Sequence, residues 1–133
     1  MNKELILKKI DENNFIECFN LKLGENQDKF VSHPIRSLAQ AYVYYNQCTP
    51  FAIYKEDVMV GYVMVIYDYD NETYNIWHMM IDEKYQGHGY GKEALCLALE
   101  FIRSFQCGKA EYSSLSYEPE NVGAKKLYST FGF

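Results

Sequence analysis

The sequence predicts one domain with a mixed α/β (α+β) fold: an antiparallel meander, then a β-α-β crossover, with helices on both faces of the sheet. Strand patterns joined by short turns fill residues 51–81, which favours the meander. The hydrophobic period becomes helical over residues 90–105 and a strand pattern follows at 110–117, which favours the crossover. A length of 133 residues is typical of one domain, so residues 1–133 are expected to form a single domain.

The N-terminal part predicts one strand and two helices. Leu5–Ile10 is a short apolar stretch that predicts the first strand. Asn14–Leu23 carries apolar residues at helical spacing, and Gly24 is suited to end that helix. A second helix is expected from Ser32 to about Gln47, with Pro34 in its first turn, where proline is tolerated.

Three strands are expected in the middle of the chain: Phe51–Glu56, Val58–Tyr67 and Tyr74–Ile81. Gly61 lies inside the second strand and predicts a bulge or a close approach of another backbone. The third strand is apolar almost throughout, as expected of a central strand. An acidic turn at residues 68–72 separates the second strand from the third.

The C-terminal part predicts helix, strand and helix. Tyr90–Phe105 is expected to be a long helix whose buried face comprises Ala94, Leu95, Ala98, Phe101, Ile102 and Phe105. Ala110–Tyr117 predicts the fifth strand. A last helix is expected from Pro119, with Ala124, Leu127, Tyr128 and Phe131 at helical offsets.

Composition restricts the class of partner. The net charge is −5, which disfavours nucleic acid and suits a cationic substrate. The four cysteines form no metal-ligand spacing with each other or with histidines, so no metal site is expected. The chain starts without an apolar signal segment and contains no apolar run long enough to span a membrane, so we expect a cytoplasmic protein that does not bind membranes.

The main chemical feature is the segment Gln86-Gly-His-Gly-Tyr-Gly-Lys92 between a strand and a helix. Alternating glycines let backbone N–H groups turn toward a ligand, and the helix N-terminus that follows attracts anions. The segment lacks the first glycine and the Ser/Thr of a P-loop, and Lys92 stands where a dinucleotide fingerprint needs glycine. A pyrophosphate cradle is the favoured interpretation, and a flexible turn is the alternative.

Two motifs resemble one family. Gln86–Gly91 resembles the Gln/Arg-x-x-Gly-x-Gly/Ala acyl-CoA motif of the GNAT superfamily of N-acetyltransferases. The segment from Asn121 through Ala124, Leu127 and Tyr128 to Gly-Phe133 is similar to that superfamily's last-helix signature. Within the superfamily, residues 76–82 and 116–121 most resemble the bacterial spermine/spermidine (diamine) acetyltransferase group. The resemblance implies a GNAT-like sheet, acetyl-CoA as co-substrate and a small-molecule amine as acceptor.

The resemblance also implies residue roles. The strand Met79-Met80-Ile81 would lie beside the pantetheine arm, and a backbone N–H near Met79 or Ile81 would polarise the thioester carbonyl. Backbone N–H groups of Gly87, His88, Gly89, Tyr90, Gly91 and Lys92, in the loop that begins at Gln86, would hold the pyrophosphate. Asn121 would contact the cofactor, with a helix cap as the alternative. Tyr128 would protonate the departing CoA thiolate, with a core aromatic as the alternative.

The amine base departs from the family pattern. Polyamine acetyltransferases often carry a carboxylate two residues before the first residue of the apolar triplet, where this sequence has Trp77. His78 is the candidate substitute because its unperturbed pKa is near neutrality. Strand alternation pointing His78 away from the site, or Asp68, Asp70 or Glu72 acting through water, are the alternatives. His33 either lines the acceptor site or caps its helix.

The length is the second departure. GNAT domains usually continue past Gly-Phe with one or two further strands, so the last strands are expected to be missing from this domain, which looks truncated after its last helix. The edge at Ala110–Tyr117 would then be open, and a homodimer or a partner strand is expected to cover it.

Two classes of function remain open at this point. One is an enzyme that moves an acetyl group from acetyl-CoA to a primary amine, such as a polyamine or diamine, with peptide or protein amines as another acceptor. The other is a non-catalytic acyl-CoA-binding sensor or regulatory module. Only the enzyme needs Tyr128 and a base, and the sequence keeps Tyr128.

Overall fold

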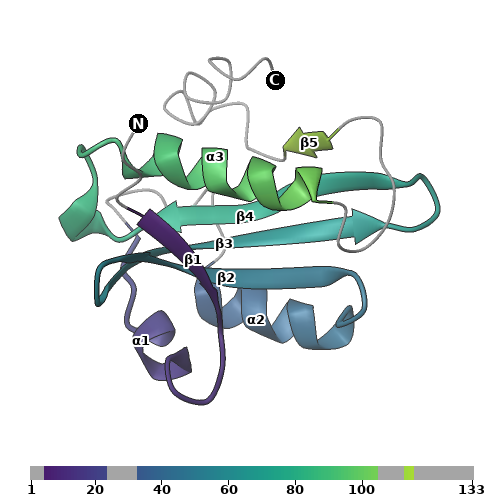
Figure 1. The fold of residues 1–133 in the computed structure, drawn as a ribbon. Coiled ribbons are helices and arrows are strands. Elements are labelled where there is room, and N and C mark those ends of the chain that lie inside the picture. The colour runs from purple at the N-terminus through teal and green to yellow at the C-terminus, as the bar shows by residue number, and fades with distance from the viewer. Residues whose placement is uncertain (1–4, 24–32, 105–112, 116–133) are drawn as a thin grey trace.

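The computed structural model describes residues 5–23, 33–104 and 113–115, whose strands and helices follow the predicted order (Figure 1). A strand and two helices come first, then three long strands, a short 3-10 helix, a long helix and a further strand. The elements are β1 (Leu5–Lys9), α1 (Phe15–Phe19), α2 (Pro34–Val43), β2 (Cys48–Lys55), β3 (Val58–Asp68), β4 (Thr73–Ile81), η2 (Glu83–Tyr85), α3 (Tyr90–Arg103) and β5 (Ser113–Leu115).

In the described part of the chain, five strands form one sheet in the order β1-β2-β3-β4-β5. The first four strands pair antiparallel with one another, which confirms the predicted meander. β5 is parallel to β4 and pairs with Tyr74, Asn75 and Ile76. A parallel neighbour requires a crossover, and α3 provides it, as predicted.

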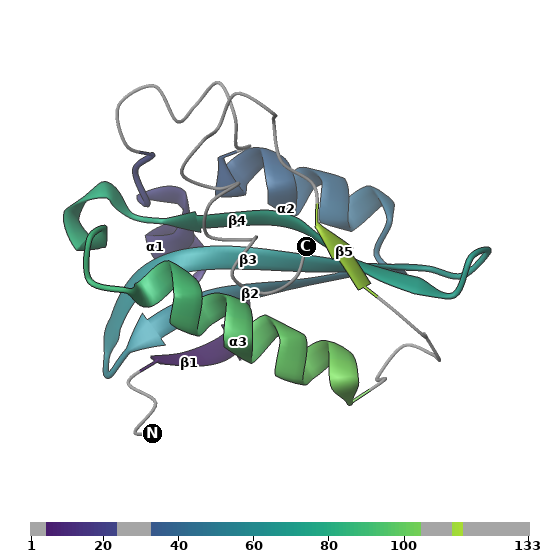
Figure 2. The same cartoon turned by 90° about the horizontal axis from the view of Figure 1, so that it is seen from above.

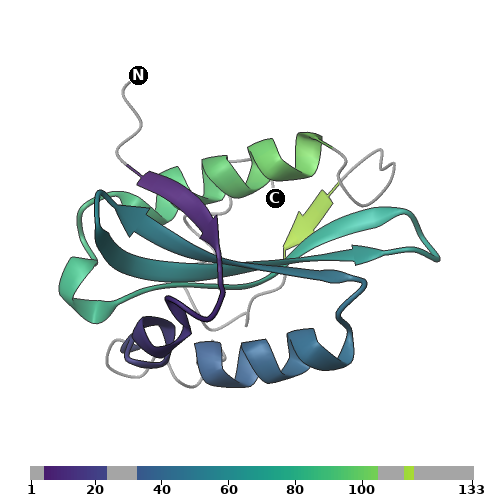
Figure 3. The same cartoon turned by 60° about the horizontal axis from the view of Figure 1, so that its bottom comes forward.

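Helices cover both faces of the sheet, as predicted (Figure 3). α3 packs on one face against a cluster that includes Tyr74, Ile76 and Ala98. α1 and α2 lie on the opposite face, over a second cluster that includes Cys18, Ala41 and Met80. The two clusters lie on opposite sides of the sheet, so β3 and β4 are covered on both faces and read as nearly continuous apolar runs.

Gly61 allows the backbones of β3 and β4 to approach closely. A Cβ atom at position 61 would lie 2.4 Å from the carbonyl oxygen of Met80. The register between β2 and β3 also shifts here, because Ile53 faces Gly61 while Tyr54 faces Met59. The predicted bulge and the predicted close approach are both confirmed.

A second bulge lies in the middle of β4. Met64 of β3 pairs with His78, while the next residue, Val65, pairs with Ile76, so Trp77 is the extra residue. An extra residue interrupts the alternation of side chains across a strand. Ile76 packs on the α3 side, whereas Trp77 and His78 both lie on the side of α2.

The ends of three elements differ from the prediction by three residues or more. α1 ends at Phe19 instead of Leu23, because the chain after Asn20 leaves the helix and buries Leu21. α2 begins at Pro34 instead of Ser32 and ends at Val43 instead of about Gln47, and the ring of His33 caps it by accepting the N–H of Ile35 at 3.1 Å. β2 begins at Cys48 rather than Phe51. The predicted last helix and both ends of the predicted fifth strand lie outside the described residues.

Candidate active site

The glycine loop connects η2 to α3 in a backbone conformation that requires glycine. Gly87 has a φ of 84° and Gly89 a φ of 80°, both in the left-handed region that L side chains rarely adopt. Gly89 is the residue from which α3 starts, and its carbonyl accepts the N–H of Glu93 at 3.2 Å. The N–H groups of Tyr90, Gly91 and Lys92 precede this first helical bond and face the loop end of the helix.

The space over these glycines is open in the part of the chain that the structure describes. A Cβ atom at Gly87 or Gly89 would meet no described atom within 4 Å, and residues 86–89 are exposed. The loop therefore presents backbone donors at a helix N-terminus with nothing described in front of them, an arrangement that suits a pyrophosphate. These residues fit the phosphate part of acetyl-CoA.

Buried carboxylate contacts hold the loop in place. Asp82, only 3% exposed, follows β4 and accepts the N–H groups of Lys22 at 2.9 Å and Lys84 at 3.0 Å. The amide of Gln86 donates to the carbonyl of Ile81 at 2.9 Å. The loop is thus attached to β4 on one side and to the segment after α1 on the other.

Among the described residues, the second half of the strand before the loop is paired along one of its two edges. Met79, Met80 and Ile81 all pair with β3, whereas the described part of β5 reaches only as far as Ile76 (Figure 2). The described pairing with β5 thus reaches the residue just before the bulge at Trp77. Met79 and Ile81 pack toward α3, and Met80 packs toward α1 and α2.

His78 lies in a small polar network between β4 and α2. Its Nδ1 is 2.7 Å from the Ser37 hydroxyl, which is also 2.6 Å from the hydroxyl of Tyr62. Burial, with Arg36 nearby, lowers the pKa of His78 to about 4. The ring is therefore neutral at physiological pH, and with Nδ1 engaged by Ser37, Nε2 is the nitrogen that remains for other contacts.

Ser37 and Tyr62 belong to this network and were not predicted from the sequence. Ser37 is separated from His78 by 41 positions and lies on a helix, where serine has many ordinary uses. The pattern contains no signal that would have paired them. Burial raises the pKa of Tyr62, so its hydroxyl stays protonated.

The sequence places five carboxylates near the sheet, Asp68, Asp70, Glu72, Asp82 and Glu83, and predicts that they attract a cationic acceptor, with a solvated turn as the alternative. They do not form one group. Asp68, Asp70 and Glu72 belong to the turn between β3 and β4, whereas Asp82 and Glu83 lie at the other end of β4. Nine residues of strand separate the two groups, about 30 Å. Asp82 is also buried and occupied by backbone N–H groups. Only the turn carboxylates can act together.

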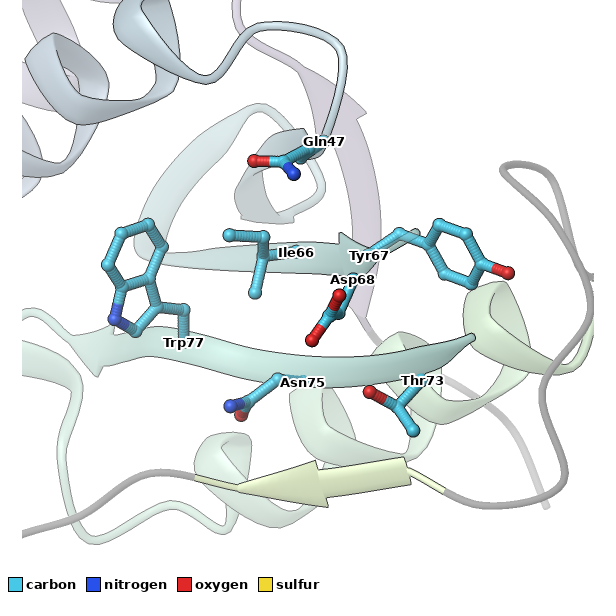
Figure 4. Close-up of a pocket in the computed structure, with 7 residues that line it drawn as sticks. All are labelled: Gln47, Ile66, Tyr67, Asp68, Thr73, Asn75 and Trp77. Atoms are coloured by element: carbon cyan, nitrogen blue, oxygen red, sulfur yellow. The ribbon is translucent and has the colours of Figure 1, made fainter. Parts of the chain in front are cut away.

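Beside this turn is a cavity of about 370 Å³ (Figure 4). Trp77 closes one end and Asp68 lies near the other (Figure 4). The lining residues are Gln47, Ile66, Tyr67, Asp68, Thr73, Asn75 and Trp77.

Two predicted site residues, Asn121 and Tyr128, lie outside the described residues. His33 is a helix cap whose Nε2 lies 2.8 Å from the carbonyl of Leu21, so its capping interpretation is confirmed. In the described residues, no group of His, Cys, Asp or Glu side chains is arranged to hold a metal ion. None of the described helices has the length and apolar character of a membrane span.

A mixed sheet with a bulged central strand, followed by a glycine loop at a helix N-terminus, is the arrangement that the resemblance to acyl-CoA-dependent transferases implies. A sequence profile described as the acetyltransferase (GNAT) family matches residues 15–133, and the chain belongs to that family. It is an N-acetyltransferase with acetyl-CoA as co-substrate, so the predicted enzyme is confirmed over the non-catalytic sensor.

Individual relatives agree with this assignment. The chain is 30% identical to the spermine/spermidine N(1)-acetyltransferase of Bacillus subtilis (strain 168) over 136 residues, covering 96% of this chain and 86% of that protein. The spermidine N-acetyltransferase from Vibrio cholerae, solved with CoA and spermine, superposes with a TM-score of 0.77 at 19% identity, covering 98% of this chain and 81% of that one. A ribosomal L7/L12 alpha-N-protein acetyltransferase in complex with coenzyme A superposes with a TM-score of 0.76 at 16% identity. The match covers 97% of this chain and 79% of that one. The two structures share the fold.

Proposed function

We propose that this acetyltransferase acts on a primary amine of a polyamine or diamine such as spermidine or spermine. The observation that carries the proposal is the 30% identity, over nearly the whole chain, to a protein named spermine/spermidine N(1)-acetyltransferase. The acidic turn at residues 68–72 and the net charge of −5 support a cationic acceptor.

The reaction we propose is direct attack of the neutral amine on the thioester that acetyl-CoA supplies. Backbone N–H groups of residues 87–92 hold the pyrophosphate, with Gln86 fixing the start of the loop. A backbone N–H near Met79 or Ile81 stabilises the oxyanion, on the stretch of β4 beyond its described pairing with β5. Tyr128 donates the proton to the leaving sulfur, and Asn121 contacts the cofactor or caps the last helix.

His78 is proposed as the base that receives the proton of the attacking amine. Its lowered pKa keeps it neutral, and Nε2 is the acceptor in the tautomer whose Nδ1–H donates to the Ser37 hydroxyl. His78→Gln is expected to lower kcat about a hundredfold with acetyl-CoA affinity retained. If kcat is unchanged, His78 is not the base, and a water near the acidic turn receives the proton instead.

The decisive experiment is release of free thiol from acetyl-CoA over a panel of amines that includes spermidine, spermine, putrescine, propylamine and a peptide with a free N-terminus. Turnover of the polyamines above the peptide is the expected result. Turnover of the peptide alone would overturn the polyamine assignment. Tyr128→Phe should lower kcat by one to three orders of magnitude while acetyl-CoA still binds.

We also propose that the protein is a homodimer. β5 is the last strand in the sheet order of the described residues, and a sheet edge is usually covered. Sedimentation velocity at micromolar concentration should give the mass of two chains. A monomer across the whole concentration range would contradict this.

A further inference from the structure

The cavity beside the acidic turn lies on the α2 side of the sheet, next to the reaction centre of the proposed function. It starts at the bulged residue Trp77, where the described pairing of β5 with β4 has just ended, and extends along β4 to Thr73. Four residues of strand correspond to about 13 Å. Gln47, from the turn between α2 and β2, lies on the opposite wall (Figure 4).

The bulge decides that the Trp77 ring lines this cavity. Without the extra residue, Trp77 and His78 would point to opposite faces of the sheet. With it, the two rings are stacked at 4.9 Å with an interplanar angle of 15°, and Tyr44 of the turn after α2 contacts the indole edge-on at 6.4 Å. The indole is therefore held in place at the end of the cavity nearest the bulge, where its face can contact methylenes or a cation.

The other end of the cavity is negative. The Asp68 carboxylate accepts hydrogen bonds from the backbone N–H groups of Asp70, at 2.9 Å, and Asn71, at 3.2 Å. It also accepts one from the side-chain amide of Asn71 at 2.7 Å. The hydrogen bonds from Asn71 and Asp70 lower the pKa of Asp68. Three accepted bonds leave the carboxylate with further acceptor capacity and its full charge. Asp70 and Glu72 follow in the same turn, and the lining residues that the structure describes include no Lys or Arg.

We propose that this cavity is the subsite for the part of the acceptor that is not acetylated: the methylenes pack on Trp77 and the second ammonium pairs with Asp68. This rests on the proposed function and adds to it a requirement for two charges. An acceptor must carry a second positive charge at a fixed distance from the reacting nitrogen. Monoamines of similar size lack that charge and bind weakly.

The first test measures turnover. Wild type, Asp68→Asn and Thr73→Lys are compared on spermidine, putrescine and propylamine at saturating acetyl-CoA. Both variants are expected to lower kcat/KM for spermidine tenfold or more, mainly by raising KM, because a charge-assisted contact is lost or opposed. The ratio of kcat/KM for spermidine to kcat/KM for propylamine should fall as well. Asp57→Asn is the matched control, since it removes one carboxylate from the exposed turn at the other end of β3.

The second test needs no turnover. Trp77 is the one tryptophan of the chain, so its fluorescence reports on this cavity. In the presence of CoA, spermine is expected to change the Trp77 emission with a midpoint that Asp68→Asn shifts about tenfold, and propylamine is expected to leave the emission unchanged at the same concentration.

The outcomes separate the two proposals. If no amine of the panel is acetylated although CoA binds, the proposed function fails. If spermidine is acetylated but its preference over propylamine survives in both variants, or if the Trp77 emission does not respond to spermine, the subsite is overturned and the proposed function stands. Thr73→Lys keeps the test valid if Asp68→Asn disturbs the turn.

Discussion

At the scale of single residues, His78 illustrates how burial changes the meaning of a side chain. Histidine on a strand near the glycine loop is an attractive base because its unperturbed pKa is near 6.5. The ring is instead buried against Ser37, and burial with Arg36 nearby lowers its pKa to about 4. The same shift that keeps the ring neutral makes it a weak base and couples folding to pH.

This coupling predicts a loss of stability in acid. The unfolded chain binds a proton at His78 below about pH 6.5, whereas the folded protein does so only near pH 4. The free energy of unfolding contributed by this group is thus fully present above pH 6.5 and decreases as the pH falls toward 4. Urea midpoints measured from pH 7 to pH 4 should show this decrease, and His78→Gln should make it shallower. Parallel curves for the two proteins would contradict the shift.

A second prediction on stability concerns Gly61, where the backbone of β4 leaves no space for a side chain. In Gly61→Ala the new Cβ would lie 2.4 Å from the Met80 carbonyl oxygen, a backbone atom that cannot move without disturbing the strand pairing. Alanine in a strand is otherwise favoured over glycine, but overpacking of this kind costs about 1 to 3 kcal/mol. Urea denaturation should show the lower stability. Val58→Ala, at an exposed position of the same strand, should change it by less than about 0.5 kcal/mol.

At the scale of elements, the glycine loop and α3 work as a unit. The loop can present its N–H groups because Gly87 and Gly89 adopt left-handed φ values and because Asp82 fixes the chain before them. α3 is fixed in turn by its apolar face, and Glu93 accepts the N–H of Leu5 in β1. The phosphate site therefore depends on both strand and helix, not on the loop alone.

Gly89→Val is expected to weaken acetyl-CoA binding roughly a hundredfold. Valine strongly disfavours a φ of 80°, and its side chain would occupy the open space over the loop. Calorimetric titration with CoA measures the change, and far-ultraviolet circular dichroism checks that the variant is folded. His88→Ala serves as the control, since it removes a side chain and keeps the N–H. If wild type and Gly89→Val bind CoA with equal affinity, the glycine loop does not bind the cofactor.

At the scale of the whole molecule, the charge of −5 is distributed unevenly around the sheet. The turn between β3 and β4 carries Asp68, Asp70 and Glu72, whereas α3 begins with a loop that suits an anion. A cationic acceptor and a polyanionic co-substrate would thus approach different ends of β4. Such fields act over about 10 Å at 0.1 M salt.

Salt should therefore act on the two substrates differently. Raising ionic strength from about 0.02 M to about 0.3 M is expected to raise the KM for spermidine several-fold, because screening weakens its attraction to the acidic turn. The KM for acetyl-CoA should not rise in parallel, because the net charge of the protein repels that anion. Steady-state kinetics with each substrate varied in turn gives both values. If the KM for spermidine does not depend on salt, electrostatic attraction does not contribute to acceptor binding, and the prediction is wrong.

The sequence by itself determined the order of the elements, the antiparallel meander, the crossover helix and the glycine loop, because hydrophobic period, turn residues and glycine spacing are local properties of the chain. It also located Gly61 as a place of close approach, since few other reasons put glycine inside an apolar strand. The family followed from the loop and the last-helix motif, and the comparisons confirm it.

Only the tertiary structure decided what surrounds those residues. The bulge at Trp77 arises from pairing with β3. No local pattern in the sequence therefore predicts that Trp77 and His78 lie on the same face of the sheet. The contact of His78 with Ser37 joins positions 41 residues apart, and the pKa of the ring depends on the burial that this contact accompanies. The acidic residues were near one another in sequence terms, yet the length of β4 holds Asp68 and Asp82 at opposite ends. Register, burial and distance across a sheet are set by partners remote in the chain, which is why they had to be seen in three dimensions.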